Sequence, residues 1–478
     1  MNRYYVTTTI PYVNARPHVG FALELAQADV IARYRRLLGS PTRLQTGADE
    51  NAFKNVLAAR EQGISPEELV ERNSEVFRKL AQALNISYDD FLRTTEARHR
   101  RAVAEFWRRL APGDVYVKPY RGLYCDGCED FLLERDLAGG RCPDHDKPPV
   151  EVREENYFFR LSAYQEKIEQ LLVSGRLRIT PESHKNEIRA FLRAGLQDIS
   201  ISRAAARAEG WGIAVPGDPG QVVYVWIDAL INYLSGPGFG EEADWRRYWG
   251  AETTKIHVIG KNVWKFHVIY WPALLLSAQL PLPDEIVIHG FLTENGRKIS
   301  KSRGNTIDPF SCIEQFGAEA VRYYLLRSVS PFADGDFSLA RLKQTYNSDL
   351  ANNLGNLVSR LTTLCAKAGY GGNFAPCVPA SPEGYHEALA GYEFDRALKL
   401  VWGLLDETNR AIERVEPWSL LKHGKRADLA EHLCNWLAQL HRAAYWLAPF
   451  LPATSAKILQ IIGEEPIAPA EALFPRIQ

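Results

Sequence analysis

The sequence contains no long hydrophobic run. Its apolar stretches, near Tyr4, Val222, Ile256 and Ile286, have the length of strands, and none reaches the roughly 20 residues that span a membrane. The N-terminus lacks the pattern of a signal peptide, because residues 1–3 lead directly into a strand that carries polar residues. We therefore expect a cytoplasmic protein without a membrane partner.

Cysteine is scarce, and neither sign of charge dominates. The chain has 7 Cys in 478 residues, and this odd number argues against a disulfide framework. The formal net charge is −1, which excludes a protein that coats nucleic acid non-specifically but leaves room for local basic faces that bind RNA. A soluble globular chain of this length exceeds one hydrophobic core, so roughly two to four domains are expected.

Strand and helix patterns alternate in the N-terminal part of the chain. Residues 4–10 are rich in aromatics, Val and Thr, which predicts a buried strand. Apolar residues recur at helical spacing from 19 to 38, and Gly39 follows as a stop signal. Further patterns predict a strand at 43–46 and helices at about 52–62, 66–84 and 96–110. This alternation favours an α/β fold with a parallel, doubly wound sheet.

The pattern changes after residue 115, where a turn-rich, cysteine-bearing stretch suggests an insertion. Core strands are expected to resume at 222–226, 256–259 and 285–289, with a helix at about 263–278. The expected division is a Rossmann domain in two halves, an insertion, a loop region and a helical C-terminal part. Their respective bounds are 1–115 with 221–290, 116–220, 291–347 and 348–478.

Two segments far apart in the chain carry groups suited to phosphate. In the first, residues 10–21, a strand runs through a Pro-rich turn to His18 and Gly20 at a helix N-terminus, where free N–H groups and the helix dipole favour an anion. In the second, residues 296–305 or the lysine loop, Lys298 and Lys301 can reach one polyanion. Taken alone, the first fits a helix-capping His and the second a solvated basic turn.

Together the two segments resemble the HIGH and KMSKS signatures of class I aminoacyl-tRNA synthetases. The resemblance implies activation of an amino acid by ATP with Mg²⁺, in which positioning and positive charge stabilise the departing pyrophosphate. It implies that His18, Lys298 and Lys301 are catalytic. The implied ATP-binding residues are His18, Gly20, Gly260, Lys261, His289, Gly290, Lys298 and Lys301.

Four further segments narrow the resemblance to the methionyl-tRNA synthetase family, over essentially the whole chain. They are residues 10–12, 47–51, 225–233 and 264–271. The resemblance implies that Asp49 pairs with the substrate ammonium and that aromatic walls hold the thioether. The implied methionine-binding residues are Ile10, Pro11, Tyr12, Asp49, Trp226, Ala229, Leu230, Tyr233, His267 and Trp271. Without the resemblance, such aromatics and a lone His are more often plain core.

The chain departs from the family pattern at several positions. Phe21 stands where the HIGH motif ends in His, and Asn262 replaces the usual Asp after Gly-Lys. Both changes remove a polar contact near ATP and are expected to slow adenylation without abolishing it. Asn51 for His and Leu230 for Pro are interpreted as variation within the family.

A CxxC and a CxxH pair, with thirteen residues between them, lie in the insertion. The four candidate ligands are Cys125, Cys128, Cys142 and His145. Four soft or imidazole ligands in two short chelating pairs suit tetrahedral Zn²⁺ with no open position, so one structural zinc per chain is expected. The alternatives are unligated thiols or a redox CxxC.

The helical C-terminal part carries Asn356 and Arg360 one turn apart, and Trp418 near the end of another helix. The family resemblance implies that these residues bind the anticodon, the two polar side chains by hydrogen bonds and Trp418 by stacking. An Asn–Arg pair is otherwise an ordinary surface feature. Because no further tRNA-binding domain follows, a monomer is expected.

These observations predict a methionine–tRNA ligase whose partners are ATP, methionine and tRNA(Met). One alternative is a synthetase-like paralogue that adenylates an amino acid for a non-translational role, which would retain pyrophosphate exchange but not charge tRNA. The other is a catalytically weak tRNA-binding protein, which would show no exchange. The anticodon-type residues argue against the first, and His18 with both lysines against the second.

Overall fold

The computed structural model describes residues 2–477 except 126–128, 133, 135–136, 144–145, 242–243, 295, 300–305 and 371–377. At 130, 131, 297 and 298 it describes the backbone alone. Within this described part, no helix is both long enough and apolar enough to cross a membrane.

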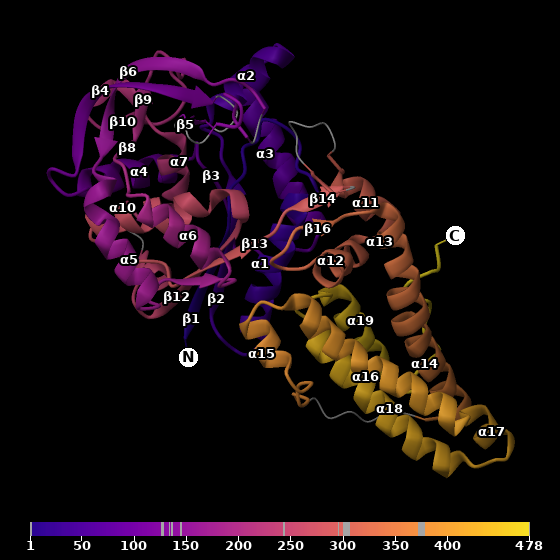
Figure 1. The fold of residues 1–478 in the computed structure, drawn as a ribbon. Coiled ribbons are helices and arrows are strands. Elements are labelled where there is room, and N and C mark those ends of the chain that lie inside the picture. The colour runs from indigo at the N-terminus through magenta and orange to yellow at the C-terminus, as the bar shows by residue number, and fades with distance from the viewer. Residues whose placement is uncertain are drawn as a thin grey trace.

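A six-stranded parallel sheet lies at the centre of the fold (Figure 1). Its strands, in spatial order, are β3 (Asp90–Arg93), β2 (Thr42–Ala48), β1 (Arg3–Thr8), β12 (Thr253–Gly260), β13 (Glu285–His289) and β7 (Arg178–Thr180). The order runs outward from β1 to β2 and β3 on one side, and from β12 to β13 on the other. Sheets of this kind bind ligands beyond the carboxyl ends of the strands at such a reversal of order.

Helices pack on this sheet, among them α1 (Val19–Leu37). It begins at His18, whose ring accepts the N–H of Gly20, and it ends with basic residues in its last turn, followed by Gly39 at φ 79°. Most of its residues are buried. The other helices in the N-terminal part are α2 (Phe53–Gln62), α3 (Pro66–Ala83) and α4 (Ala97–Arg109), as the sequence patterns predict.

The range expected as an insertion forms two small antiparallel sheets. One contains β5 (Asp130–Leu132), β4 (Val115–Cys125), β6 (Val150–Phe159) and β8 (Ile199–Ser200). The other contains β10 (Ala214–Val215), β11 (Asp218–Val223) and β9 (Ser202–Ala204). The helices α5 (Gln165–Val173) and α6 (His184–Arg193) flank β7, which leaves this region and pairs with β13 at the edge of the central sheet.

The prediction of a core strand at 222–226 is wrong. Val222 and Val223 end β11, which pairs with β9 in the small antiparallel sheet, and α7 (Val225–Leu230) and α8 (Asn232–Ser235) follow. The apolar run is buried, but short apolar runs do not distinguish a parallel core strand from an antiparallel strand that leads into a buried helix.

A third small sheet follows the central one and consists of β14 (Leu292–Glu294), β15 (Arg297–Lys298) and β16 (Gly335–Asp336). The chain between β12 and β13 is helical, with a 3-10 turn at Lys261–Val263, a π-helical turn at Phe266–Tyr270 and α10 (Trp271–Ser277). The connection from β15 to β16 carries α11 (Pro309–Phe316) and α12 (Ala318–Arg327).

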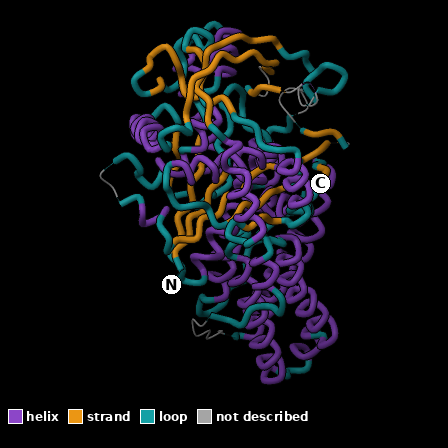
Figure 2. The backbone as a smooth tube through the Cα atoms, turned by 60° about the vertical axis from the view of Figure 1, so that its left-hand side comes forward, coloured by secondary structure: helices purple, strands orange, loops and turns teal. Residues whose placement is uncertain are grey.

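The C-terminal part is a helical bundle that extends away from the sheets, with α17 near its far tip (Figures 1 and 2). After α13 (Leu339–Thr345) and a π-helical segment (Tyr346–Gly355) it contains α14 (Asn356–Ala368), α15 (Tyr385–Ala390), α16 (Phe394–Val415), α17 (Pro417–Lys422), α18 (Arg426–Leu447) and α19 (Pro452–Ile462). The fully buried Arg322 on α12 connects this bundle to α1, because its guanidinium lies 2.8 Å from Asp29 and also donates to the carbonyls of Pro449 and Phe450.

Candidate active site

The N-terminus of α1 is built around His18. Its Nδ1 accepts the N–H of Gly20 at 3.0 Å, so the ring lies across the first turn of the helix. A Cβ at position 20 would lie 2.7 Å from the ring, so Gly20 is required for this position of His18. The space that a side chain at position 20 would take is therefore occupied by the His18 ring.

The segment that follows the lysine loop docks on this same turn. The N–H of Val19 donates to the carbonyl oxygen of Ile307 at 3.2 Å. Beside it, Arg16 lies 3.7 Å from Asp308 and 5.7 Å from the centre of the Phe310 ring. The structure therefore brings the two motif regions, almost 300 positions apart, into contact at the carboxyl end of β1.

Of the two lysines in the loop, Lys298 lies on β15, where its backbone pairs with Thr293. Lys301 lies outside the described residues, as does the loop from 300 to 305. At the start of the loop, the N–H of Gly296 donates to Asp336 at 3.1 Å, and beyond its end Ile307 accepts from Val19 in the first turn of α1.

At the carboxyl end of β13, His289 is held between the two halves of the sheet. Its Nε2 lies 2.9 Å from Glu24 on α1, and its Nδ1 lies 2.8 Å from the carbonyl oxygen of Gly290. The other carboxylate oxygen of Glu24 accepts from the N–H and hydroxyl of Thr9 at 2.7 and 2.6 Å. Glu24 and Thr9, which the sequence analysis missed, thus tie β1, α1 and β13 together.

The remaining expected nucleotide residues surround His289. A Cβ on Gly260, at the end of β12, would lie 3.6 Å from the His289 ring, so the two strand ends are adjacent. Lys261 does not point at open space, because its ammonium lies 2.7 and 2.8 Å from the two oxygens of Asp334. Phe21, which stands where the HIGH motif ends in His, is part of the hydrophobic core. Its ring packs on Phe77 with centroids 5.4 Å apart.

Asp49 lies at the carboxyl end of β2 and is completely buried. Its N–H donates to the carbonyl oxygen of Pro11 at 2.9 Å, and it bridges to Tyr12 beside the end of β1. Burial, and then the nearby carboxylates of Asp228 and Glu129, raise the pKa of Asp49 well above its usual value. Its Oδ2 has no hydrogen-bond partner among the described residues. A buried acid with an open oxygen among other acids is suited to bind a cation.

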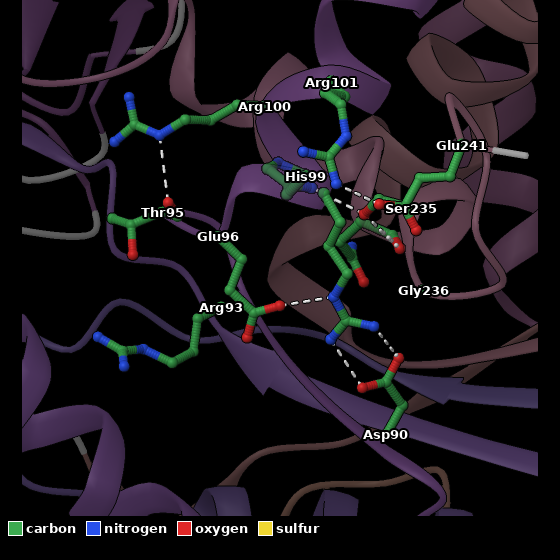
Figure 3. Close-up of polar contacts among 12 residues, drawn as sticks. Asp90, Arg93, Thr95, Glu96, His99, Arg100, Arg101, Ser235, Gly236 and Glu241 are labelled. Atoms are coloured by element: carbon green, nitrogen blue, oxygen red, sulfur yellow. Dashed lines mark hydrogen bonds and ion pairs between the residues drawn. The ribbon is translucent and has the colours of Figure 1, made fainter.

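Asp228 is fixed in place by residues that the sequence analysis did not single out for a role. His99 lies 2.6 Å from one of its oxygens, and the amide of Asn51 donates to the other at 2.7 Å. Figure 3 shows His99 beside Ser235, its second partner at 2.8 Å. His99 lies on the apolar face of α4, where a single His gives no sequence signal of this role.

Tyr233 and His267 form a buried pair at the base of the expected methionine pocket. The Nδ1 of His267 lies 2.9 Å from the carbonyl oxygen of Val263 and must donate to it, so Nε2 accepts from the hydroxyl of Tyr233 at 2.8 Å. Burial lowers the pKa of His267 to about 4, which keeps the ring neutral. Trp271 lies 6.2 Å from Tyr233, centroid to centroid, and stacks on Phe106.

The opposite wall is aromatic. Trp226 stacks on Phe266 with centroids 4.0 Å apart and 7° between the planes, and it lies 5.7 Å from Tyr12. Phe266 was not predicted for the site. Three other residues expected in the methionine pocket are also buried. Ile10 packs beside Gly47 on β2, and Ala229 and Leu230 lie on α7, between Trp226 and Tyr233 in the chain.

Two of the four expected metal ligands can be placed. Cys125 ends β4 and is buried, and Cys142 is buried at the start of a tight turn in which its carbonyl accepts the N–H of Asp146 at 2.8 Å. Cys128 and His145 lie outside the described residues. Across the described ranges no group of three or more His, Cys, Asp or Glu side chains could hold a metal.

The three expected anticodon residues line one hollow near the tip of the bundle, with a volume of about 950 Å³. Asn356 and Arg360 come from α14, and Trp418 comes from α17 with 53% of its surface exposed. The guanidinium of Arg360 donates to Asn409 on α16, which in turn donates to Asn353 at 2.8 Å. Asn409 and Asn353 were not predicted.

Known proteins match the chain over its whole length. The family described as tRNA synthetases class I (M) matches residues 4–148 and 145–362. The methionine–tRNA ligase of Caldanaerobacter subterraneus subsp. tengcongensis is 40% identical over 479 residues, which cover 96% of this chain and 74% of the relative. That of Mycobacterium bovis is 39% identical over 518 residues and covers 100% of this chain and 98% of the relative.

Solved structures agree with the sequence matches. Mycobacterium tuberculosis methionyl-tRNA synthetase in complex with methionyl-adenylate superposes with a TM-score of 0.91 at 39% identity, over 100% of both chains. The apo form of the same enzyme gives a TM-score of 0.84 at 36% identity, over 100% of this chain and 99% of the other. The chain therefore belongs to the class I tRNA synthetases and, among these, to the methionyl-tRNA synthetase family.

Proposed function

We propose that this chain is a methionine–tRNA ligase whose activation site lies at the carboxyl ends of β1, β2, β12 and β13. The observation that carries this proposal is the hydrogen bond from Val19 to Ile307, because it joins the turn of His18 to the flank of the lysine loop. A triphosphate bound at this edge would meet the N-terminus of α1 and the lysines together.

In the first reaction the methionine carboxylate attacks the α-phosphorus of ATP, and pyrophosphate leaves. We assign ATP contacts to His18, Gly20, Gly260, His289 and Gly290, and the stabilisation of the departing pyrophosphate to Lys298 and Lys301. The ATP is bound as its Mg²⁺ complex. Little covalent work falls to protein groups, so orientation and positive charge supply the acceleration.

Methionine is assigned to the pocket between Asp49 and the Tyr233–His267 pair. Its ammonium would take the open Oδ2 of Asp49, and its thioether would pack between Trp226 and the rings at the base. A neutral His267 fits an uncharged thioether better than a cation would. The remaining proposed pocket residues are Ile10, Pro11, Tyr12, Ala229, Leu230 and Trp271.

In the second reaction the terminal ribose of tRNA(Met) attacks the carbonyl of the adenylate, through the 2′-OH in class I enzymes. We assign anticodon binding to Asn356, Arg360 and Trp418, supported by their shared hollow at the end of the bundle. The proposed domains are those of the sequence division, except that β7 belongs to the catalytic sheet.

We also propose one structural zinc in the insertion, held by Cys125, Cys128, Cys142 and His145. The two described thiols fit this site, because both are buried, one at the end of β4 and one at the start of a turn. A bound zinc would link the end of β4 to the turn that begins at Cys142. It has no assigned part in the chemistry.

The decisive experiment is ATP–pyrophosphate exchange with a panel of amino acids, followed by charging of tRNA(Met). We expect methionine to support the fastest exchange and the chain to form methionyl-tRNA. Faster exchange with another amino acid would contradict the substrate assignment, and exchange without charging would favour the biosynthetic paralogue.

A further inference from the structure

Two aspartates lie at the short strand β16: Asp334 just before it and Asp336 on it. They contact the two ends of the chain segment that borders the proposed nucleotide site. Strand β16 pairs in parallel with β14, so that Gly335 lies opposite Leu292 and Asp336 opposite Thr293. Asp334 precedes this strand. The segment 333–336 therefore runs alongside the strand that leads into the lysine loop.

Asp334 joins the end of β12 to the start of β14. Both of its oxygens accept from the Lys261 ammonium, at 2.7 and 2.8 Å, and Oδ1 also accepts the N–H of Phe291 at 2.9 Å. The same ammonium lies 4.6 Å from the centre of the Phe291 ring, within the range of a cation–π contact. Two groups from separate parts of the chain, the Lys261 ammonium and the Phe291 N–H, thus meet at one carboxylate.

The backbone of segment 333–336 packs directly against the backbone that follows β13. A Cβ on Gly290 would lie 2.2 Å from the carbonyl oxygen of Ala333, so the segment crosses directly over the residue after His289. The N–H of Gly335 donates to the carbonyl oxygen of Phe291 at 2.9 Å. The position of segment 333–336 is therefore fixed relative to the strand end that lies next to the proposed nucleotide site.

Asp336 binds the other end of the hairpin. Its Oδ1 accepts from the hydroxyl of Thr293 at 3.0 Å and from the N–H of Gly296 at 3.1 Å. Gly296 has φ 73°, a left-handed conformation that glycine adopts without strain, and it is the first residue of the lysine loop. The carboxylate thus fixes the turn from which β15 and Lys298 follow.

We propose that Asp334 and Asp336 form a clasp that sets the position of the β14–β15 hairpin, and with it Lys298, relative to the end of β12. The inference rests on the proposed function, since it concerns the step in which pyrophosphate leaves. It makes Lys261, Asp334 and Asp336 positioning residues that act through the hairpin. Lys261 is accordingly assigned to the clasp rather than to the ATP contacts.

The partial exposure of the pair distinguishes positioning from stabilisation. The side chains of Lys261 and Asp334 are 33% and 43% exposed, and ion pairs of this kind contribute little to folding. Breaking the pair should therefore leave the fold intact. A shift of about 1 Å in a group that meets the transition state can nevertheless cost about a hundredfold in rate.

The test compares Lys261→Met, Asp334→Asn, Asp336→Asn and the double variant Lys261→Met/Asp334→Asn in methionine-dependent exchange. Each single variant should lower kcat by about ten- to a hundredfold, while the methionine dissociation constant, followed by tryptophan fluorescence, and the Tm stay unchanged. The double variant should be no slower than the slower single variant, because both changes remove one contact. The exchanged pair Lys261→Asp/Asp334→Lys should regain part of the rate.

Arg121→Gln is the matched control, because it removes a similar two-point ion pair, with Glu151, on the exposed surface of the insertion. It should not change the rate. The clasp is overturned if the aspartate variants keep the full kcat, if the Lys261 and Asp334 effects multiply, or if methionine binding weakens in parallel. Methionine-dependent exchange by the unmodified chain tests the proposed function separately.

Discussion

The hydroxyl of Tyr233 donates to the Nε2 of His267 at 2.8 Å, deep in the protein. Because Val263 takes the other ring N–H, this bond fixes both the orientation and the tautomer of His267. The pair thereby presents an uncharged, rigid surface at the base of the proposed methionine pocket.

Removing this bond should weaken methionine binding. Tyr233→Phe leaves the Nε2 of His267 buried without a donor, which costs about 1–3 kcal/mol. We expect the methionine KM in pyrophosphate exchange to rise by about tenfold, with a lower Tm. Tyr385→Phe is the control: its hydroxyl also makes a buried bond, to Trp446 at 2.6 Å, but in the bundle. A rise in KM of equal size in both variants would show that the effect is only one of stability.

Methionine binding should depend on the protonation of Asp49. Burial and the neighbouring carboxylates of Asp228 and Glu129 hold the pKa of Asp49 well above its usual 3.8, so an ammonium that pairs with the ionised form displaces a proton. Affinity for methionine should therefore fall as the pH falls through this raised pKa, and calorimetry in buffers of different ionisation enthalpy should detect proton release.

Asp49→Asn should remove the proton release and weaken binding by about a hundredfold or more, because a buried charge loses its partner. Without methionine, the stability of the fold should depend on pH in the opposite direction. The raised pKa means that the folded chain holds the proton more tightly than the unfolded chain, so the empty site destabilises the fold as the pH rises. An unchanged pH profile in Asp49→Asn would eliminate this carboxylate as the source.

Metal analysis of the purified chain should find roughly one zinc per molecule. Cys125→Ser and Cys142→Ser should each lose most of this zinc and lower the Tm. All the ligands of a structural site hold one ion together, so the loss of one ligand weakens the whole site. Cys434→Ser is the matched control, since that thiol is exposed on α18 in the bundle. Zinc retained in both cysteine variants, or absent from the unmodified chain, would contradict the site.

The hollow at the end of the bundle should affect charging but not activation. Arg360→Ala and Trp418→Ala should each lower kcat/KM for tRNA(Met) by about 5- to 150-fold, since stacking on one base contributes about 1–3 kcal/mol. Pyrophosphate exchange should be unchanged. Arg396→Ala, on α16 and paired with Glu393 away from the hollow, should alter neither assay. A loss of exchange in Trp418→Ala would place the effect elsewhere.

The sequence predicted the elements whose patterns are local. Helices α1 to α4 and strands β1, β2, β12 and β13 lie where periodicity and stop signals indicate. It missed β3 and β7, because a short edge strand is recognised by its neighbour rather than by its own residues. It also predicted a core strand where β11 passes into α7, since both contexts bury the same apolar run.

In the site, the sequence could indicate residue types but not their partners. Asp49 was found through its motif, yet the acids that raise its pKa come from α7 and from the insertion. His99 and Glu24 gave no signal, because each acts by a contact with a residue more than 100 positions away. Lys261 was expected to bind ATP, and only its distance to Asp334 indicates another role.

The middle of the central sheet has a consequence for how the chain is made. Strand β1 is synthesised before its neighbour β12, and Arg3 lies opposite Thr253, 250 positions later. At about 5–20 residues per second, one edge of β1 stays uncovered for about 10 to 50 s of synthesis. Translation stalled before residue 253 would leave the backbone groups along one edge of β1 unpaired and free to pair with other chains, so nascent fragments of this protein should be strong chaperone clients.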